Sequence, residues 1–351
     1  MNSYLITDVP TIYADMNVYR YIACGDISIY KPTRFKWVYS HVHLEEVHRN
    51  GNTDALEGMK ILSAVEIDDV LNEKFQSVGN VTLKKCLDPY LRYEQHLEAI
   101  KGYENANNHM VEHLIRIFGA DNFCELSKTP DQMREEIERL TAEIDPKART
   151  ELLDKAEVVS DEMKDSINTH LKDKMPIDKT RLAMGITSEI RKDIERSDSP
   201  IDAIWNLISP SLDGITKDQF FGFEQIPGIE GIQHTQYGAI SGSQIVLNML
   251  GISPDQGLAK REKIKNIMSD GQHVGMASYC NALLSADRRF CNKARAVYEY
   301  LGNVTSALHF EFKKGMALNF GVQRSETSSL DGNIIQVTQA GRPTRAPYRN
   351  A

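Results

Sequence analysis

The spacing of apolar and polar residues predicts alternating strands and helices in the N-terminal part of the chain. Residues 11–14 form a short apolar run, and the stretch after them has helical spacing. Residues 35–39 are strand-like and lead through Ser40, which is suited to capping a helix, into a second helix. A further helix over residues 53–63 and a short strand over residues 64–67 follow. This alternation is typical of an α/β fold with a parallel sheet.

A similar pattern returns near the other end of the chain. Asp270 is predicted to open a helix that runs to about Asn281, and the apolar residues 282–284 are predicted to form a strand. Asp287 lies just past that strand, at the turn into the next helix, as Asp15 lies just past the first strand. Open α/β sheets bind their ligands at such strand ends, so we expect Asp15 and Asp287 to belong to one functional site.

Four acidic residues are expected to converge at that site and to be both its metal ligands and its catalytic groups: Asp15, Glu46, Asp270 and Asp287. Closely packed carboxylates repel one another unless a cation neutralises them. Oxygen ligands without a thiolate suit Mg²⁺ or Mn²⁺, which keep open positions for phosphate oxygens. Such an ion can activate a water and stabilise charge on an attacked phosphate. These residues therefore predict a metal-dependent phosphodiester hydrolase.

The first two acids stand in motifs that resemble those of the PIN-domain nucleases, a family of metal-dependent ribonucleases. In that family an aspartate in a D-x-N context ends the first strand, and Asp15 and Asn17 match it here. A glutamate follows a serine by about six residues on the helix after the second strand, as Glu46 follows Ser40. Glu45 adjoins Glu46, and the distance from the serine favours Glu46 as the ligand.

The other two acids resemble the family by their context as well. A third acid of the family begins a helix of the form D-x-x-x-x-x-x-A, which Asp270 and Ala277 match. A fourth follows the next strand in a T/S-x-D pattern, which Ser285 and Asp287 match. The resemblance covers roughly residues 8–80 and 262–312.

The resemblance implies a three-layer α/β/α fold with a small parallel sheet and an endonuclease activity on single-stranded or structured RNA. The preference for RNA comes from the resemblance alone, because no residue pattern here distinguishes ribose from deoxyribose. The groups that it places around a bound Mg²⁺ or Mn²⁺ are the four acids and two supporting side chains: Asp15, Glu46, Asp270, Asp287, Asn17 and Ser285.

A long helical segment interrupts the PIN-like part of the sequence. Apolar spacing becomes helical soon after residue 87, whereas members of the family are usually compact single domains. We therefore expect a PIN-like part at residues 1–86, a helical insertion at 87–257, the remaining PIN-like part at 258–318 and a polar, mobile tail at 319–351. The insertion could bind a protein partner or form a homodimer.

Composition excludes a membrane protein and a disulfide-rich secreted domain. The chain has 351 residues, 41% of them hydrophobic, which is enough for a substantial core. Its five cysteines are an odd number without C-x-x-C pairing, and no apolar segment follows a basic one at the N-terminus, so we expect a cytoplasmic protein. No run approaches the roughly 18 apolar residues that span a bilayer.

The net charge of −8 is unusual for a protein that binds nucleic acid, because phosphate contacts depend on lysine and arginine. Basic residues nevertheless cluster after Asp287, in the run that contains Arg288, Arg289, Lys293 and Arg295. Arg288 and Arg289 directly follow a predicted metal ligand, so we expect them to bind substrate phosphates.

Other interpretations of the same residues remain open. His41, Glu45 and His48 have the spacing of a zinc site on one helix face, although no H-E-x-x-H motif is present. Asp270 and Asp287 precede predicted helices, where a carboxylate can simply cap the N-terminus. At the level of function, the alternatives are a protein-interaction scaffold that keeps the nuclease fold, and a metal-dependent phosphatase of small phosphate esters.

Overall fold

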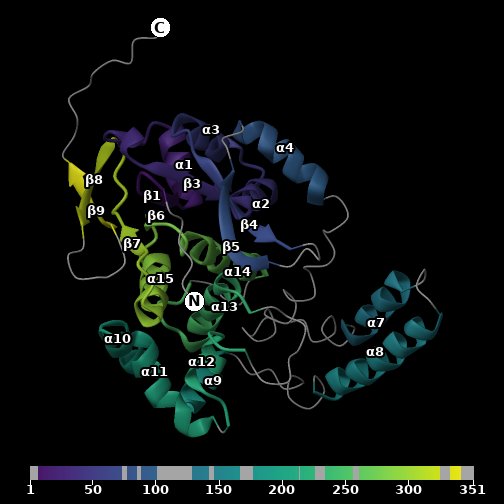
Figure 1. The fold of residues 1–351 in the computed structure, drawn as a ribbon. Helices are drawn as coiled ribbons and strands as arrows, with labels where there is room; N and C mark the ends of the chain where they lie inside the picture. Colours follow the sequence, from purple (N-terminus) through teal and green to yellow (C-terminus); the bar gives the residue numbers. More distant parts are fainter. Residues whose placement is uncertain are drawn as a thin grey trace. The chain divides into compact units, whose positions relative to one another are not determined.

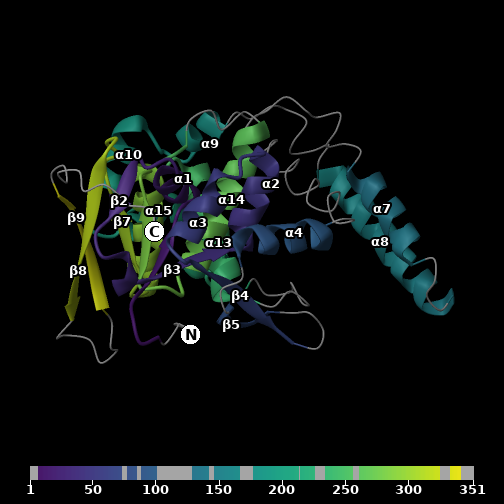
Figure 2. The same cartoon turned by 90° about the horizontal axis from the view of Figure 1, so that it is seen from above.

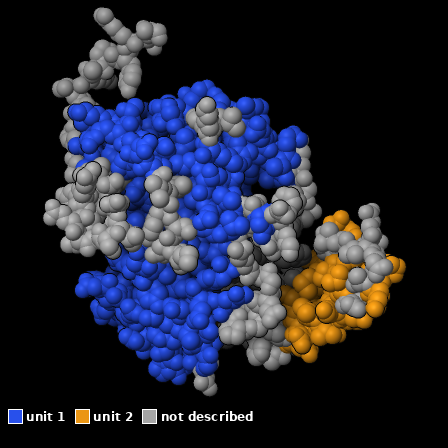
Figure 3. Space-filling view, in the orientation of Figure 1, with its two compact units in different colours: residues 1–101, 188–255, 267–351 blue, residues 102–187, 256–266 orange. Residues whose placement is uncertain are grey.

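The computed structural model describes residues 7–72, 77–84, 88–100, 129–141, 146–166, 177–212, 214–225, 234–255, 261–324 and 333–340. The chain divides into two compact units (Figure 3). Unit 1 comprises Met1–Lys101, Ser188–Asp255 and Ile267–Ala351, and unit 2 comprises Gly102–Thr187 and Gln256–Asn266. This division differs from the insertion predicted over residues 87–257, because residues 88–100 and 188–255 pack with unit 1. All four predicted site acids belong to unit 1.

Unit 1 is built on a six-stranded sheet with the order β5, β4, β3, β1, β6, β7 (Figure 1). Its strands are β1 (Thr11–Ala14), β3 (Lys36–Ser40), β4 (Val65–Leu71), β5 (Ser77–Lys84), β6 (Ala282–Ser285) and β7 (Ser306–His309). The edge strand β5 is antiparallel to β4, and the other neighbours are parallel. Ile12 pairs with Trp37 on one side and Ala282 on the other, so distant parts of the chain meet at β1. The predicted α/β class with a mostly parallel sheet is confirmed.

Side-chain alternation along β1 explains why helices cover both faces of this sheet. Ile12 and Ala14 point to one face and join a core with residues of α1 (Met16–Ala23) and α3 (Asp54–Ile61). Tyr13 points to the opposite face, where its ring contacts His273 of α14 (Arg261–Ala277). Helix α13 (Gln236–Leu250) lies beside α14 (Figure 2).

The other described helices belong partly to unit 1 and partly to unit 2, where α7 and α8 pack against each other. They are α2 (His41–Asn50), α4 (Pro89–Ile100), α7 (Thr129–Leu140), α8 (Pro146–Ser166), α9 (Ile177–Ala183), α10 (Ser188–Glu195), α11 (Pro200–Ile208), α12 (Lys217–Phe221) and α15 (Arg288–Leu301), with short 3₁₀ turns η1 (Pro32–Arg34) and η3 (Ser209–Ser211). Over the described part of the chain, no helix is both long and apolar enough to span a membrane.

A second, three-stranded sheet was not predicted. It has the order β2 (Ile27–Ile29), β8 (Met316–Arg324), β9 (Asn333–Ala340). Two stretches of the segment 319–351, which was expected to be a mobile tail, therefore pair as strands. The physical reason is an alternation of apolar residues that continues past residue 319: Leu318 and Phe320 are both buried in the same core as Ile12.

Candidate functional site

The candidate site lies where the order of the strands reverses. The chain leaves β1 for β3 on one side and later adds β6 and β7 on the other side. Ligand crevices of open α/β sheets lie at such a switch point, outside the carboxyl ends of the strands. Asp15 directly follows β1 and Asp287 follows β6, so both predicted positions are confirmed.

Ser285 connects these two aspartates. Its hydroxyl donates a hydrogen bond of 2.7 Å to Asp15 Oδ2, and its oxygen accepts one of 3.0 Å from the Asp287 backbone N–H. The Asp15 carboxylate makes no capping hydrogen bond to α1, so capping does not explain this acid. The Asp287 carboxylate does cap α15, because it accepts hydrogen bonds from the N–H groups of Arg289 and Phe290 at 2.8 and 3.1 Å.

Asp270 does not open a helix, which corrects the prediction. It lies inside α14, which already begins at Arg261. Ile264 and Ile267 are fully buried at helical spacing, and their packing extends the helix on the N-terminal side of the aspartate. Capping of this helix therefore cannot account for Asp270. Ala277 ends the same helix.

Glu46 is held by residues of α14 and by Arg49 of its own helix. Its Oε1 accepts a hydrogen bond of 2.7 Å from Ser269 and one of 3.0 Å from Arg49. Its Oε2 lies 3.5 Å from His273 Nε2, an electrostatic contact rather than a well-formed hydrogen bond. Burial alone would raise the pKa of Glu46, but His273, Ser269 and Arg49 outweigh burial and lower that pKa to about 2. Glu45, by comparison, is only half-buried.

The four acids affect one another electrostatically, and together they are called the acid cluster below. Burial raises the pKa of Asp15, and the charges of Glu46 and Asp287 raise it further, against the opposing effects of His273 and Ser285. Burial also raises the pKa of Asp270 well above its ordinary value. The charge of Lys293 opposes this shift, and the charges of Asp255, Asp15 and Glu46 add to it. Glu46 is buried and Asp15 and Asp270 are half-buried at the switch point, whereas Asp287 is exposed.

The chemistry of the acid cluster fits a hard divalent cation. Its donors are carboxylate oxygens, and burial raises the pKa values of Asp15 and Asp270 in spite of the opposing charges of His273 and Lys293. Within the described ranges, no three side chains of histidine, cysteine, aspartate or glutamate lie close enough together to hold one ion. The predicted ligands Asp15, Glu46, Asp270 and Asp287 are all described, so no three of them are arranged around one ion position.

A buried polar network that the sequence did not predict lies beside the acid cluster. The Tyr13 hydroxyl is 2.7 Å from both Ser40 Oγ and His273 Nδ1. The Ser40 backbone N–H donates to His43 Nδ1 at 3.1 Å, so His43 must carry its proton on Nε2, which donates to the Ala14 carbonyl at 2.8 Å. Burial and the charge of His273 lower the pKa of His43 to about 3, so it is neutral. The spacing Ser40-x-x-His43, which resembles a capping box, was the available signal.

Lys293 is a second residue of this region whose role the sequence did not predict. It was grouped with the basic residues that could follow a nucleic-acid backbone, but its side chain is fully buried. Its Nζ donates to Asp255 Oδ2 at 2.8 Å and to Asn248 Oδ1 at 3.1 Å, and its charge opposes the raised pKa of Asp270. Its burial could have been predicted from helical spacing, because Lys293 lies between Phe290 and Val297 on the buried face of α15.

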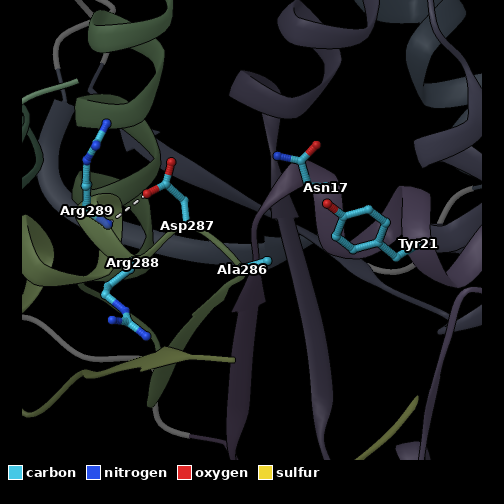
Figure 4. A pocket seen from close by; sticks show the side chains of 6 residues that line it. All are labelled: Asn17, Tyr21, Ala286, Asp287, Arg288 and Arg289. Atoms are coloured by element: carbon cyan, nitrogen blue, oxygen red, sulfur yellow. Dashed lines mark hydrogen bonds between the residues drawn. The ribbon is translucent and has the colours of Figure 1, made fainter. Parts of the chain in front are cut away.

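A cavity of about 440 Å³ opens beside Asp287. Side chains from α1 and from the start of α15 face each other across it (Figure 4). The residues that line it are Asn17, Tyr21, Ala286, Asp287, Arg288 and Arg289. The cavity is therefore lined by the predicted supporting residue Asn17, by both predicted phosphate-binding arginines and by the site acid Asp287.

The residues of the alternative zinc site lie on α2. His41 and Glu45 are half-buried and His48 is exposed. His96 of α4 packs nearby, and burial together with the charges of His41, Arg92 and His48 lowers its pKa to about 4. Among the side chains that the structure describes, these residues do not form a group that could hold a metal ion.

Comparisons with known proteins do not identify a family for this chain: no family model, no curated protein and no solved structure matches it.

Proposed function

We propose that the protein is a metal-dependent endonuclease that hydrolyses phosphodiester bonds, with RNA as the expected substrate. The acid cluster supports this proposal most strongly. Asp15, Glu46 and Asp270 come from distant parts of the chain, and the charges of Asp15 and Glu46 raise the pKa of Asp270 at the place where α/β sheets bind ligands. Acids whose ionised forms are disfavoured, as those of Asp15 and Asp270 are, are difficult to explain as structural residues, and binding of a cation would explain them.

Each residue then has a defined task. Asp15 and Asp270 would hold a Mg²⁺ or Mn²⁺ ion, with Glu46 and Asp287 beside them. A bound ion of this kind supplies an activated water and stabilises charge on the phosphate. Ser285 fixes the Asp15 carboxylate through its 2.7 Å hydrogen bond, and Ser269 fixes Glu46 in the same way.

The substrate would approach through the cavity beside Asp287. Arg288 and Arg289 are exposed at its edge and can bind phosphate oxygens. RNA is preferred over DNA on the resemblance to the PIN-domain nucleases. The helical segments of unit 2 are assigned no task in the reaction.

The test is cleavage of end-labelled single-stranded RNA by the purified full-length protein with Mg²⁺ or Mn²⁺. We expect cleavage that EDTA abolishes. Asp15→Asn and Asp270→Asn should each lower the rate by at least about 100-fold, since even the loss of a residue that orients a metal ligand costs about 10- to 100-fold. Asp54→Asn, which alters an exposed aspartate on α3, is the matched control and should cleave like the wild type.

Other outcomes separate the alternative functions. Cleavage that persists in both Asp15→Asn and Asp270→Asn would show that the acid cluster is not the active site. Failure to cleave any RNA or DNA would favour the scaffold, and hydrolysis of small phosphate esters without cleavage of polymers would favour the phosphatase.

A further inference from the structure

Two aromatic rings are stacked at the edge of the candidate site. Tyr21 belongs to α1, and Phe312 lies in the turn between β7 and β8. Their ring centroids are 4.0 Å apart and their planes differ by 23°. Phe312 nevertheless remains 39% exposed, so this pair is not closed off inside a core.

Tyr21 connects this pair to the acid cluster. Its side chain is one wall of the 440 Å³ cavity and faces Asp287 and Arg289 across it (Figure 4). Burial and the charge of Asp15 both raise the pKa of the Tyr21 phenol, so its hydroxyl lies within the electrostatic reach of Asp15. Phe312 is stacked on this Tyr21 ring.

Basic residues are close in sequence to Phe312 or pair with residues next to it. Lys313 and Lys314 follow Phe312 in the chain, and all three are exposed. Arg288 pairs with Glu311 at 2.9 Å and Lys314 pairs with Asp26 at 3.1 Å. Exposed ion pairs of this kind contribute little to stability, so a phosphate can replace the carboxylate partner at small cost.

Aromatic rings that alternate with basic groups are the pattern by which proteins bind single-stranded nucleic acid. The ring offers a stacking surface to a base, and the cations bind the backbone on either side. The cavity size also falls in the range of small-ligand sites, roughly 300–1,000 Å³. Double-stranded substrates keep their bases paired and do not present a free face to such a ring.

We propose that Tyr21 and Phe312 form a base-stacking subsite for a single-stranded nucleic acid, next to the phosphodiester that reaches the acid cluster. The inference rests on the proposed endonuclease function for the chemistry of its ligand. It adds that the strand is held unpaired at the cleavage position and that recognition there involves a base and not the backbone alone.

Binding of a short fluorescent single-stranded oligonucleotide, measured by anisotropy in EDTA, tests this subsite without cleavage. We expect Tyr21→Leu and Phe312→Leu each to raise Kd by about tenfold, within the range known for loss of base stacking. Tyr21→Phe keeps the ring and should bind like the wild type. An oligomer of the same length without bases should bind the wild type and the leucine variants equally. The experiment is done with RNA and with DNA.

Tyr30→Leu is the matched control, because Tyr30 is another exposed aromatic residue (54% exposed) beside a lysine. Tyr30 follows β2, whereas Asp26, the partner of Lys314, precedes it. The control substitution should leave Kd unchanged, and thermal unfolding of every variant checks that the fold is intact. The subsite is refuted if the leucine variants bind the normal oligonucleotide like the wild type, if they lose equal affinity for the base-free oligomer, or if the wild type binds no oligonucleotide. Cleavage in Mg²⁺ or Mn²⁺ is scored separately: base-dependent binding without cleavage would keep the subsite and refute the endonuclease.

Discussion

At the scale of single residues, the site depends on polar groups that are buried and must therefore be paired. The sequence contained the acids in recognisable motifs, and the positions of Asp15, Ser40 and Asp287 at element ends could be predicted from it. The pairing of Glu46 with Ser269 could not, because a side-chain contact between residues so distant in sequence depends on how two helices pack. The burial of Lys293 could have been inferred from its place on the apolar face of α15.

His43 gives a pH-dependent contribution to stability whose sign follows from its environment. Its pKa in the folded protein is about 3, below the ordinary value of 6.5, so unfolding takes up a proton when the pH is below 6.5. The contribution is therefore complete above pH 6.5 and is lost as the pH falls towards 3, by at most about 1.4 kcal/mol per pH unit.

The substitution His43→Gln tests this contribution. Glutamine can accept the Ser40 N–H bond as in an ordinary capping box, but it does not titrate. Chemical denaturation between pH 7 and pH 4 should show a smaller loss of unfolding free energy for the variant than for the wild type. Parallel curves for the two proteins would mean that His43 is not a neutral buried histidine.

Lys293 and Lys314 each pair with an aspartate but differ in burial. The side chain of Lys293 is fully buried and that of Lys314 is 84% exposed. Lys293→Met should lower the free energy of unfolding by about 3–5 kcal/mol, because it leaves Asp255 charged in a poorly solvated place. Lys314→Met should change it by less than about 1 kcal/mol. Equal effects in urea denaturation would contradict the inferred difference, and Lys293→Met combined with Asp255→Asn should recover part of the loss.

At the scale of elements, the buried apolar runs predicted β1, β3 and β6 because each run ends at, or within two residues of, a side chain suited to a helix N-terminus. The short strand β2 and the edge strand β7 have neither a following capping residue nor a fully apolar run, so the local sequence pattern did not predict them. The start of α14 was misplaced because an aspartate inside a helix has the same local appearance as a cap. The burial of Ile264 and Ile267 shows that the helix begins before Asp270.

Helix α1, which follows Asp15, packs closely against α3. A Cβ added to Gly58 would lie 2.0 Å from the Tyr19 carbonyl oxygen, a backbone atom that cannot rotate away. Gly58→Ala should therefore destabilise the protein by about 3 kcal/mol, the upper part of the range for overpacking. Gly242→Ala on α13 meets no atom within 4 Å and should instead stabilise by up to about 1 kcal/mol. Thermal unfolding of the two variants measures the contrast, and destabilisation of similar size in both would contradict the packing described here.

At the scale of the whole molecule, the feature that sequence reasoning captured best is the reunion of the two ends of unit 1 in one sheet. Ile12 pairs with Ala282, and Ser285 connects the acids that follow β1 and β6 by hydrogen bonds. The boundaries of the helical insertion were harder to predict from the sequence, because helices that pack on the sheet and helices of unit 2 have the same amphipathic spacing. Only contacts distinguish them.

The most direct test of the account is a crystal structure of the protein soaked in Mn²⁺, with anomalous scattering to locate the ion. The acid cluster predicts an anomalous peak within coordination distance, roughly 2.0–2.3 Å, of carboxylate oxygens of both Asp15 and Asp270. Asp270→Asn crystals treated in the same way should lose or weaken that peak. Saturating Mn²⁺ without a peak at these carboxylates, or with a peak at another place only, would contradict the proposed metal-dependent chemistry.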